Sequence, residues 1–389
     1  MTQESNIFPY IARLLQGAEV VWKPLGEVAE LKRGTTITKK TSNEGIYPVI
    51  SGGQQPAYYI DQFNRDGETI TVAGSGAYAG FVMYWNEPIF VGDAFSIKAN
   101  EEQVLPRYIY HFLLNIQEKI YDLKSGGGVP HVYAKDVARF VIPLPPLSAQ
   151  QEIVRILDKF TNLEAELEAE LESRKRQYEY YRNKLLNFNE IGGIEIVWKT
   201  LGEVATFRRG SFPQPYTKSE WYGGDNSMPF VQVADMKDNR FNLVSITKQR
   251  ISQLAMPKSI FVPKGTILVS LQGTIGRVAI TQYDSYVDRT IAIFTHINNE
   301  IDIRYFAYQL QLIFGIKKEN ARGSTIKTIT KEEFSAFLIP LPPLSEQQRI
   351  ATILDKFDTL VNSISEGLPK EIALRRKQYE YYREQLLRF

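Results

Sequence analysis

The sequence contains no cysteine and only three histidines in 389 residues. Without cysteine the chain can form neither disulfide bonds nor thiolate zinc sites, a composition that fits a reducing cytoplasm. His111, His131 and His296 are too scattered to predict a metal site. No apolar run has the length of a membrane span, and the first residues do not resemble a signal peptide. We therefore expect a cytoplasmic protein that holds no metal ion.

Motifs for nucleotide binding and catalysis are also missing. The sequence has neither a GxxxxGK(S/T) loop nor the Asn/Asp-Pro-Pro-aromatic motif of adenine methylation. The stretch GSGAYAG at residues 74–80 has no βαβ context, so we interpret it as a glycine kink in a strand rather than as a cofactor loop. We therefore predict no catalytic residues and no cofactor bound to this chain.

The charge is nearly balanced, at +2. Residues 1–140 hold 13 basic and 15 acidic side chains, whereas residues 190–338 hold 18 and 14. Global charge therefore does not indicate a nucleic-acid binder, and any phosphate binding must come from local clusters of basic residues.

The most informative feature is an internal repeat that runs through the whole chain. Long divergent stretches, Thr35–Val141 and Ser211–Leu338, separate segments that occur twice. Even the first residues, YIARLL, echo YRNKLL at 181–186, which indicates a closed arrangement with pseudo-two-fold symmetry and neighbouring termini. The repeated segments are VWKPLGEVAELKRG (21–34, again near-identically at 197–210), IPLPPLSAQQEIVRILDKF (142–160, 15 of 19 letters kept at 339–357) and QYEYYR (177–182 and 378–383).

Each divergent stretch predicts a mixed α+β domain. Runs such as TILVSLQG and GFVMYW are rich in β-branched and aromatic residues and are bounded by glycine or polar residues, as strands are. The segments PRYIYHFLLNIQEKIYDL and IRYFAYQLQLIFGIKK carry apolar residues at helical spacing.

A long helix is predicted after each PLPPLS segment. Ser148 or Ser345 would cap the helix, with Gln151 or Gln348 three positions later. The first helix should run for about 40 residues, or roughly 60 Å. Its apolar stripe needs a partner, and the second copy supplies one, which predicts an antiparallel coiled coil between the halves. In the second copy, GLP at 367–369 should break or kink the helix.

The centre of the first helix is a tandem repeat, LEAELEAELE at 163–172. One reading is a solvated acidic helix face, and the other is a ruler that sets the separation of the two domains. The second copy is four residues longer between Phe357 and Gln378 than the first between Phe160 and Gln177. Four residues make about one helical turn, so this difference keeps the apolar stripe on roughly one face.

The doubled WKxLGEV, PLPPLSxQQ and RRKQYEYYR-like segments resemble the specificity subunit of type I restriction-modification enzymes, over essentially the whole chain. The resemblance is to the subgroup with short tandem repeats in the central helix. It implies an α+β fold in which two mixed α/β target-recognition domains are separated by two long helices that form an antiparallel coiled coil. The implied segments are target-recognition domains at 1–147 and 190–344 and conserved spacer helices at 148–189 and 345–389.

The resemblance also implies a function and a set of partners. Each domain would read one half of a bipartite, asymmetric site on double-stranded DNA. Two methyltransferase subunits, which carry S-adenosylmethionine, and two motor-nuclease subunits, which use ATP, would bind the conserved parts. The chain itself would be a non-catalytic subunit. The alternative that we keep is a coiled-coil adaptor with two unlike protein-binding domains, because residues 1–140 lack a strongly basic patch.

Candidate DNA contacts are polar and basic side chains beside glycines, because glutamine and arginine can pair with base edges and lysine with phosphate. Arg208 and Arg209 lie in a repeated segment, where their counterparts are Lys32 and Arg33. A role common to both halves, such as phosphate contact, therefore suits them better than base reading. The candidates are Lys39, Lys40, Ser51, Gln54, Gln55, Tyr78, Lys124 and His131 in the first domain, and Arg208, Arg209, Gln214, Tyr216, Lys218, Gln232, Gln272, Thr274, Arg277, Arg322 and Lys327 in the second.

The QYEYYR segments divide into two faces of a helix. Tyr178 and Tyr181 fall on the apolar stripe and should pack in the coiled coil. The other residues point elsewhere and are candidates for partner binding. These candidates are Glu179, Tyr180 and Arg182, with their counterparts Glu380, Tyr381 and Arg383.

Overall fold

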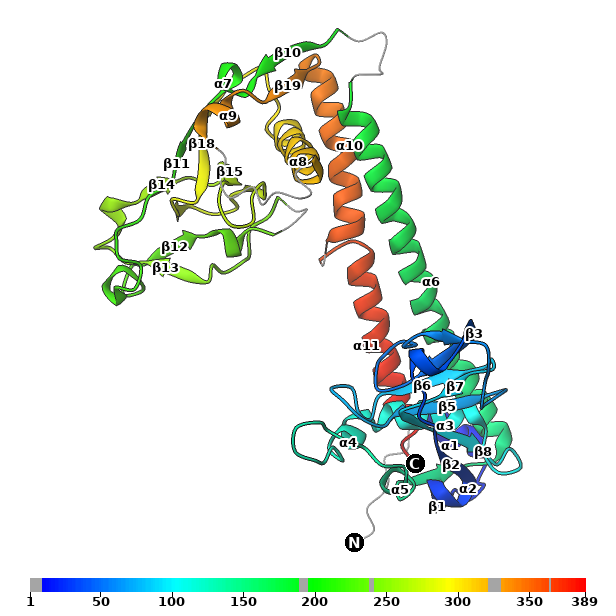
Figure 1. Cartoon of the computed structure of the whole chain (residues 1–389). Helices are drawn as coiled ribbons and strands as arrows, with labels where there is room; N and C mark the ends of the chain where they lie inside the picture. The colour runs from blue at the N-terminus through cyan, green and yellow to red at the C-terminus, as the bar shows by residue number, and fades with distance from the viewer. Residues whose placement is uncertain (1–8, 189–194, 238–240, 321–329, 364) are drawn as a thin grey trace. The chain divides into compact units, whose positions relative to one another are not determined.

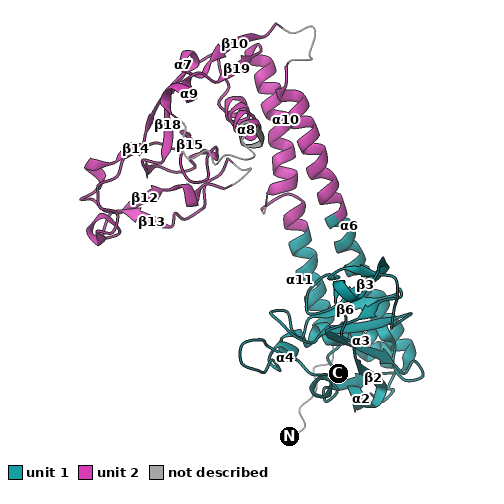
Figure 2. Cartoon of the chain, in the orientation of Figure 1, with its two compact units in different colours: residues 1–168, 372–389 teal, residues 169–371 magenta. Residues whose placement is uncertain are grey.

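The computed structural model describes residues 9–188, 195–237, 241–320, 330–363 and 365–389. The chain forms two compact units, which Figure 2 shows in different colours. Unit 1 comprises residues 1–168 and 372–389, and unit 2 comprises residues 169–371. The boundary between the units falls inside the longest helix.

Unit 1 is an α+β domain with a pair of helix segments attached (Figure 1). Its elements in chain order are α1 (Pro9–Leu15), β1 (Val21–Pro24), α2 (Leu25–Val28), β2 (Ala29–Arg33), η1 (Lys39–Thr41), β3 (Glu44–Ile50), β4 (Tyr59–Ile60), β5 (Thr69–Ala73), β6 (Val82–Trp85), β7 (Phe90–Val91), β8 (Ala94–Ala99), α3 (Pro106–Asn115), α4 (Gln117–Tyr121), α5 (Ala134–Val137), β9 (Val141–Leu144), the first part of α6 (Leu147–Leu186) and most of α11 (Leu368–Leu386).

Unit 2 repeats this architecture. Its elements are the rest of α6, β10 (Val197–Thr200), α7 (Leu201–Val204), β11 (Ala205–Arg209), η2 (Ser219–Trp221), β12 (Met228–Val231), η3 (Val233–Asp235), β13 (Gln249–Ile251), η4 (Met256–Lys258), β14 (Ile260–Val262), β15 (Ile267–Ser270), β16 (Val278–Ile280), β17 (Ser285–Val287), β18 (Ile291–Ile297), α8 (Ile303–Asn320), α9 (Lys331–Ser335), β19 (Leu338–Leu341), α10 (Leu344–Asn362) and the start of α11.

The sheets of the two units have the same order, although the two sequences differ between the repeated segments. The four-stranded sheet runs β2-β8-β5-β6 in unit 1 and β11-β18-β15-β16 in unit 2. A second sheet contains a parallel pair in each unit, β3 with β7 and β12 with β17. The repeated segments themselves pair as two-stranded antiparallel sheets, β1 with β9 and β10 with β19. The divergent stretches are therefore two versions of one fold.

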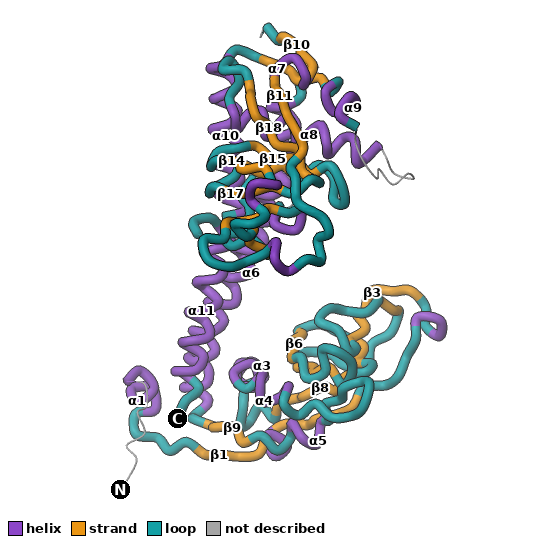
Figure 3. Tube along the Cα trace, turned by 90° about the vertical axis from the view of Figure 1, so that its left-hand side faces the viewer, coloured by secondary structure: helices purple, strands orange, loops and turns teal. Residues whose placement is uncertain are grey.

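A helix lies between the four-stranded sheet and the long helices in each unit. In unit 1, α3 contacts β5, β6 and β8, and Figure 3 shows it between this sheet and the long helices. Arg107 of α3 bonds to Asp158 of α6. Tyr108 and Ile109 of α3 are completely buried in the cluster that also holds Ile153 of α6. In unit 2, α8 contacts β16 and α10 in the corresponding way. These helices attach each domain to its part of the coiled coil.

The predicted serine caps are wrong. α6 begins at Leu147 and α10 at Leu344, so Ser148 and Ser345 already lie inside the first turn. Pro343 is the N-cap residue of α10 and makes no side-chain capping bond. The carbonyls of Pro146 and Pro343 accept the first backbone hydrogen bonds of the two helices, from the N–H groups of Gln150 (3.0 Å) and Gln347 (3.1 Å).

Buried glutamine side chains make hydrogen bonds at the starts of these helices. The amide of Gln150 donates to the carbonyl of Pro145 (2.9 Å), and its oxygen accepts from the backbone N–H of Leu105 (3.0 Å). In unit 2, the oxygen of Gln347 accepts from the backbone N–H of Asp302 (3.0 Å). Each glutamine therefore ties the start of a long helix to the segment that precedes α3 or α8.

The helices confirm the predicted coiled-coil pairing within each unit. In unit 1, the ring of Phe160 stacks on that of Tyr382 (centroids 5.2 Å apart), and Arg376 pairs with both Glu164 and Glu168. Residue numbers rise along α6 as they fall along α11, so the two segments are antiparallel. In unit 2, Tyr178 of α6 stacks on Phe357 of α10 (6.3 Å).

The second long helix is broken where the sequence predicts a break. α10 ends at Asn362 and α11 begins at Leu368, with Pro369 in its first turn. A β-carbon on Gly367 would lie 2.3 Å from the carbonyl oxygen of Thr359, so only glycine fits where the chain turns back against α10.

The ends of the described chain meet in unit 1 (Figure 1). Ile11 and Leu15 of α1 share one hydrophobic cluster with Leu386 and Leu387. This agrees with the closed arrangement that the repeat predicts.

The glycine-rich stretch at 74–80 is not a kink within a strand. It connects β5 to β6, which pair as antiparallel neighbours from Thr69–Trp85 to Val72–Val82. Gly76 and Gly80 adopt positive φ angles of 85° and 88°, which turns require. The sequence pattern does not separate a kink from a loop, because both need glycine between two β-rich runs.

Substitution of Gly34 should test how tightly the repeated segment is packed. A β-carbon on Gly34 would lie 2.2 Å from the carbonyl oxygen of Gly92 and 2.4 Å from that of Val91. Gly34→Ala should therefore lower the free energy of unfolding by about 1–3 kcal/mol, as overpacking does. Gly127→Ala is the control, because nothing lies within 4 Å of its β-carbon position. Equal urea midpoints for the two variants, followed by circular dichroism, would contradict this packing.

Candidate nucleic-acid interface

Three loops of unit 1 meet at one end of its four-stranded sheet, and they carry most of the first-domain candidates. The backbone N–H of Gly76 donates to the carbonyl of Pro130 (3.0 Å), which joins loop 74–81 to loop 124–133. A β-carbon on Gly52 would lie 2.4 Å from the carbonyl oxygen of Ser75, which places the third loop, 51–57, beside them. The candidates on these loops are Ser51, Gln54, Gln55, Tyr78, Lys124 and His131.

Several of these side chains are partly engaged within the domain. Nζ of Lys124 donates to the carbonyl of Ala77 (3.3 Å) and lies over the ring of Tyr121. The ring of His131 stacks on that of Tyr133. By contrast, Tyr78 remains 48 % exposed at the tip of its loop. The lower parts of these loops are therefore held by contacts within the domain, whereas Tyr78 at a loop tip is exposed.

A small recess in this region contains an arginine that the list of candidates omits. Arg33, at the end of β2, lines a recess of about 70 Å³ together with Asp93, His131 and Tyr133. Its counterpart in unit 2 is Arg209, and both are exposed at the ends of edge strands. The repeated KRG and RRG segments carry the signal that identifies Arg33.

Lys39 and Lys40 lie elsewhere in unit 1. They form η1 with Thr41, next to Ile37, whose side chain packs on the cluster around Val49. The structure therefore places these two lysines with the smaller sheet rather than on the three loops.

In unit 2, the candidates Gln214, Tyr216 and Lys218 follow β11. The hydroxyl of Tyr216 donates to Asp288, and the guanidinium of Arg289 lies 5.3 Å from the centre of the Tyr216 ring. Burial and this bond to a carboxylate raise the pKa of Tyr216. Tyr216 therefore fixes the loop, and Arg289, which sequence reasoning missed, lies beside it.

Two lysines flank a buried indole in the same region. Nζ of Lys218 lies 4.7 Å, and Nζ of Lys258 4.6 Å, from the centre of the Trp221 ring, which is 5 % exposed. Lys218 also pairs with Glu220 at 2.5 Å. The cation–π contacts hold both ammonium groups at one surface. Lys258 is a second residue that sequence reasoning missed, since it lies 40 positions from Lys218.

The remaining described candidates of unit 2 surround the loop between β15 and β16. Gln272 and Thr274 lie on that loop. Arg277, at its end, donates from Nη1 to the carbonyl of Val233 (3.1 Å), and Gln232 is the N-cap residue of η3, which begins at Val233. Arg277 therefore supports the loop from inside the domain. Arg208 is exposed on β11, and Arg322 and Lys327 lie outside the described residues.

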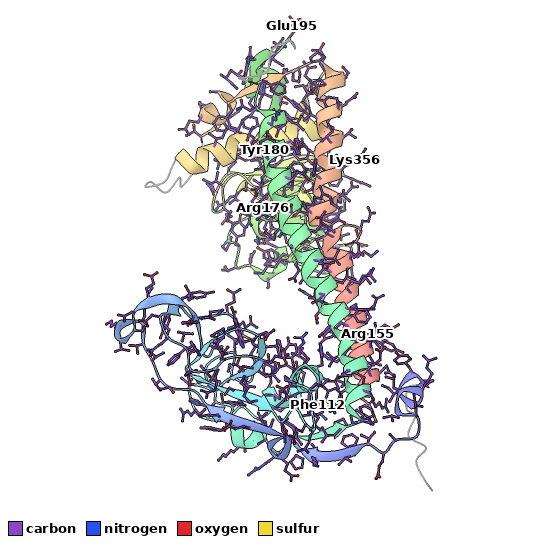
Figure 4. All side chains as sticks on the ribbon, turned by 90° about the vertical axis from the view of Figure 1, so that its right-hand side faces the viewer. Phe112, Arg155, Arg176, Tyr180, Glu195 and Lys356 are labelled. Atoms are coloured by element: carbon purple, nitrogen blue, oxygen red, sulfur yellow. The ribbon has the colours of Figure 1, made fainter. Side chains whose placement is uncertain are left out.

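The repeated QYEYYR segment has one buried and one exposed face. Tyr178 and Tyr379 are 6 % and 7 % exposed, whereas Tyr180 and Tyr381 are 60 % and 55 % exposed. Figure 4 shows Tyr180 on α6. Glu179 and its counterpart Glu380 are exposed on the same helices.

The two arginines of this segment each lie over the ring of a tyrosine one helical turn earlier. The guanidinium of Arg182 lies 5.8 Å from the centre of the Tyr178 ring, and that of Arg383 lies 5.0 Å from the Tyr379 ring. Both arginines are half-buried. Their long side chains reach back over the neighbouring ring, which one turn of the helix places within range.

A charged pair joins the domain to the coiled coil in each unit. Nε of Arg107 on α3 donates to Oδ1 of Asp158 on α6 (3.1 Å), and Nη2 donates to the same carboxylate. Nε of Arg304 on α8 donates to Asp355 on α10 in the same geometry (3.0 Å). Burial raises the pKa of Asp158, but hydrogen bonds from His111 and Arg107 outweigh it, so the pKa is lowered.

The third member of this network differs between the units. In unit 1, Nε2 of the fully buried His111 lies 2.7 Å from Oδ1 of Asp158, and Nδ1 lies 2.8 Å from the hydroxyl of Tyr379 on α11. In unit 2, the hydroxyl of Tyr308 donates to Asp355 (2.8 Å). The same position is therefore a titratable histidine in one unit and a tyrosine in the other.

Within the described residues, no group of three histidine, aspartate or glutamate side chains is placed to hold a metal ion. None of the described helices is long and apolar enough to cross a membrane.

The comparisons with known proteins agree with this architecture. The family model of the type I restriction modification DNA specificity domain matches twice, at residues 18–173 and 194–374. The chain is 32 % identical over 411 residues to the type I restriction enzyme EcoR124I/EcoR124II specificity subunit of Escherichia coli, covering 98 % of this chain and 97 % of that protein. It is also 32 % identical to a putative type I specificity subunit of Haemophilus influenzae, with 98 % of each chain covered.

Solved structures show the same fold at lower identity. The S subunit of a type I restriction-modification system from M. genitalium aligns with a TM-score of 0.63 at 18 % identity, covering 100 % of this chain and 98 % of that one. The duplicated scaffold with two unlike sets of loops is thus the architecture of a specificity subunit. The chain belongs to the family of type I restriction-modification specificity subunits.

Protonation of His111 should destabilise unit 1. Burial lowers the pKa of His111, although the hydrogen bond to Asp158 acts in the opposite direction. The unfolded chain, with an ordinary histidine pKa of about 6.5, therefore binds more protons than the folded chain as the pH falls below that value. We expect the apparent melting temperature to fall between pH 7.5 and pH 5.5.

His111→Tyr copies the arrangement of unit 2 and should remove most of this pH dependence. His131 and His296 are unchanged in the variant, so any pH dependence that they cause should remain. The measurement is the apparent melting temperature by circular dichroism at several pH values. Parallel pH profiles for the wild-type chain and the variant would contradict a role for His111.

Proposed function

We propose that this chain reads a bipartite, asymmetric site on double-stranded DNA, with one half-site contacted by the loops of each unit. The observation that carries the proposal is the contrast between scaffold and loops. The arginine–aspartate pairs, the glutamine ties and the two-stranded sheets are the same in both units. The loops at the ends of the equivalent sheets differ in sequence and contacts. One scaffold that presents two unlike surfaces suits a site whose halves differ.

The charges near the loops support contact with phosphate. In unit 2, Lys218 follows β11 and Lys258 ends η4, and both lie over Trp221, while Arg289 follows β17 and lies over Tyr216. In unit 1, Arg33 and Lys124 provide positive charge near the three loops, although residues 1–140 are slightly acidic overall. Phosphate contacts position a protein on DNA, and polar side chains on the loops read the base edges.

The chain would act through partners. The family membership supports a complex in which two methyltransferase subunits, with S-adenosylmethionine, and two motor-nuclease subunits, with ATP, assemble on the repeated scaffold. The repeated surface accounts for two copies of one partner, because equivalent positions are present in each unit. The other function that we consider is an adaptor whose two domains bind proteins.

Variants in the loops should change one half-site at a time. We expect Gln54→Ala with Gln55→Ala to relax the preference for one half-site, and Gln272→Ala to relax the other, by about tenfold at the affected position. Lys218→Ala should instead weaken binding to all sequences and lower the salt dependence by about one unit of slope.

These effects are measured on the full complex with its methyltransferase subunits, by competition among DNA sequences at several salt concentrations. The wild-type complex should bind DNA more weakly as salt increases, because phosphate contacts release counterions. Absence of any sequence preference would contradict DNA reading and favour the protein-binding adaptor.

The tandem repeat in α6 should set the gap between the half-sites. α6 is continuous from Leu147 to Leu186, and Arg376 pairs with Glu164 and Glu168, which occupy the same place in successive EAEL units. One further EAEL unit after Leu171 lengthens the helix by about 6 Å and turns it by about 40°.

We expect this insertion to lengthen the preferred gap by about one base pair and to leave both half-sites unchanged. The measurement is the methylated motif of the inserted variant compared with that of the original chain. An insertion of four alanines at the same place separates helix length from the acidic face. Altered half-sites would show that α6 does more than space the domains.

A further inference from the structure

The two-stranded sheets made by the repeated segments have an exposed apolar face. In unit 1, Trp22 and Val141 lie on the same face of the sheet, because Trp22 pairs with Pro143 and Val141 pairs with Pro24, two residues further along β1. They are 52 % and 49 % exposed. A single exposed apolar residue is ordinary, but a tryptophan and a valine on one face of a small sheet form a patch.

Unit 2 has the same patch at the equivalent positions. Trp198 and Leu338, which share one face of the β10–β19 sheet, are 46 % and 56 % exposed. The register is also the same, because Trp22 lies opposite Pro143 and Trp198 opposite Pro340. The patch is thus present twice on a chain whose loop surfaces differ between the units.

The strands that pair with the tryptophan strands, β9 and β19, are bonded to the protein interior. The hydroxyl of the buried Tyr108 donates to the carbonyl of Pro143 (2.9 Å), and that of the buried Tyr305 donates to the carbonyl of Pro340 (2.7 Å). Each bond anchors the residue opposite a tryptophan. A rigid platform lowers the entropy cost of placing a large aromatic side chain in an interface.

In unit 2 the patch borders a groove of about 500 Å³. Trp198, Leu338 and Ile316, which is 49 % exposed, supply its apolar lining. Arg182 and Asn183, from the end of α6, supply polar groups. The groove therefore connects the tryptophan patch to the helix segment that contains Tyr180.

We propose that the β1–β9 face of unit 1 and the β10–β19 face of unit 2 each dock one copy of the methyltransferase subunit, with Trp22 or Trp198 as the buried anchor. The proposal rests on the proposed function, and it adds a surface to the helix residues predicted from the sequence. A matching apolar patch on both units fits one type of partner that binds twice. Tryptophan is among the residues most enriched at the energetic centres of protein interfaces.

The test uses the full chain co-expressed with its own methyltransferase subunit and measures stoichiometry by native mass spectrometry. The wild-type chain should carry two methyltransferase copies. Trp22→Ala and Trp198→Ala should each carry one, and the double variant should bind at least tenfold more weakly at both places. Trp→Phe at either position should retain much of the binding.

Matched controls separate loss of docking from loss of folding. Ile46→Ala and Ile246→Ala remove side chains that are 78 % and 80 % exposed, outside the repeated segments, and should leave two copies bound. Melting temperatures of the tryptophan variants should equal that of the wild-type chain.

Two results would overturn the proposal in different ways. If the wild-type chain binds two copies and the double variant still does so with equal affinity, the patch is not the docking surface, and the proposed function stands. If the wild-type chain binds no methyltransferase subunit, both the proposed function and this surface are rejected. Normal methyltransferase binding with loss of the motor-nuclease subunit would also reject this assignment.

Discussion

The structure depends on one interaction made twice, the arginine–aspartate pair between a domain helix and a long helix. Arg107 with Asp158 in unit 1, and Arg304 with Asp355 in unit 2, are half-buried and have nearly the same geometry. Removing one member of such a pair leaves the other charge poorly solvated, so these contacts fix how each domain meets its helix. The buried glutamine ties and the tyrosine–proline bonds act at the same junction.

This junction explains how the two units can share one scaffold and still carry different loops. The residues that attach each domain to the coiled coil come from the repeated segments and from α3 or α8 or the residue just before them. Among the described residues, the candidate DNA-contact loops take no part in these bonds. Loops can therefore differ between the units without disturbing the scaffold. A difference inside the network, His111 against Tyr308, keeps the carboxylate bonded in both units and places a histidine, whose pKa burial lowers, in unit 1.

Much of the scaffold could be predicted because its signals are local or are repeated. The apolar stripe predicted a 40-residue helix, and Gly367 with Pro369 predicted the break in the second one. The shared sheet order of the divergent stretches could not be predicted, because strand order depends on contacts between residues far apart in the sequence. The serine caps failed because each long helix begins one residue before the serine, and the place of the Arg182 guanidinium over the Tyr178 ring could not be predicted because a flexible side chain can reach a neighbouring ring. Lys258 and Arg289 could not be predicted as site residues, because only the fold brings them beside Trp221 and Tyr216.

The most direct test of the proposed function is to map adenine methylation in cells that express the chain with its methyltransferase subunit. The chain is co-expressed with its methyltransferase subunit in a host without other adenine methylation, and methylated adenines are located across the genome. The account predicts one motif with two unlike half-sites separated by a fixed gap of unspecified bases. A methyltransferase that is bound and active but modifies DNA without such a motif would contradict it and would mean that the two units recognise something other than DNA.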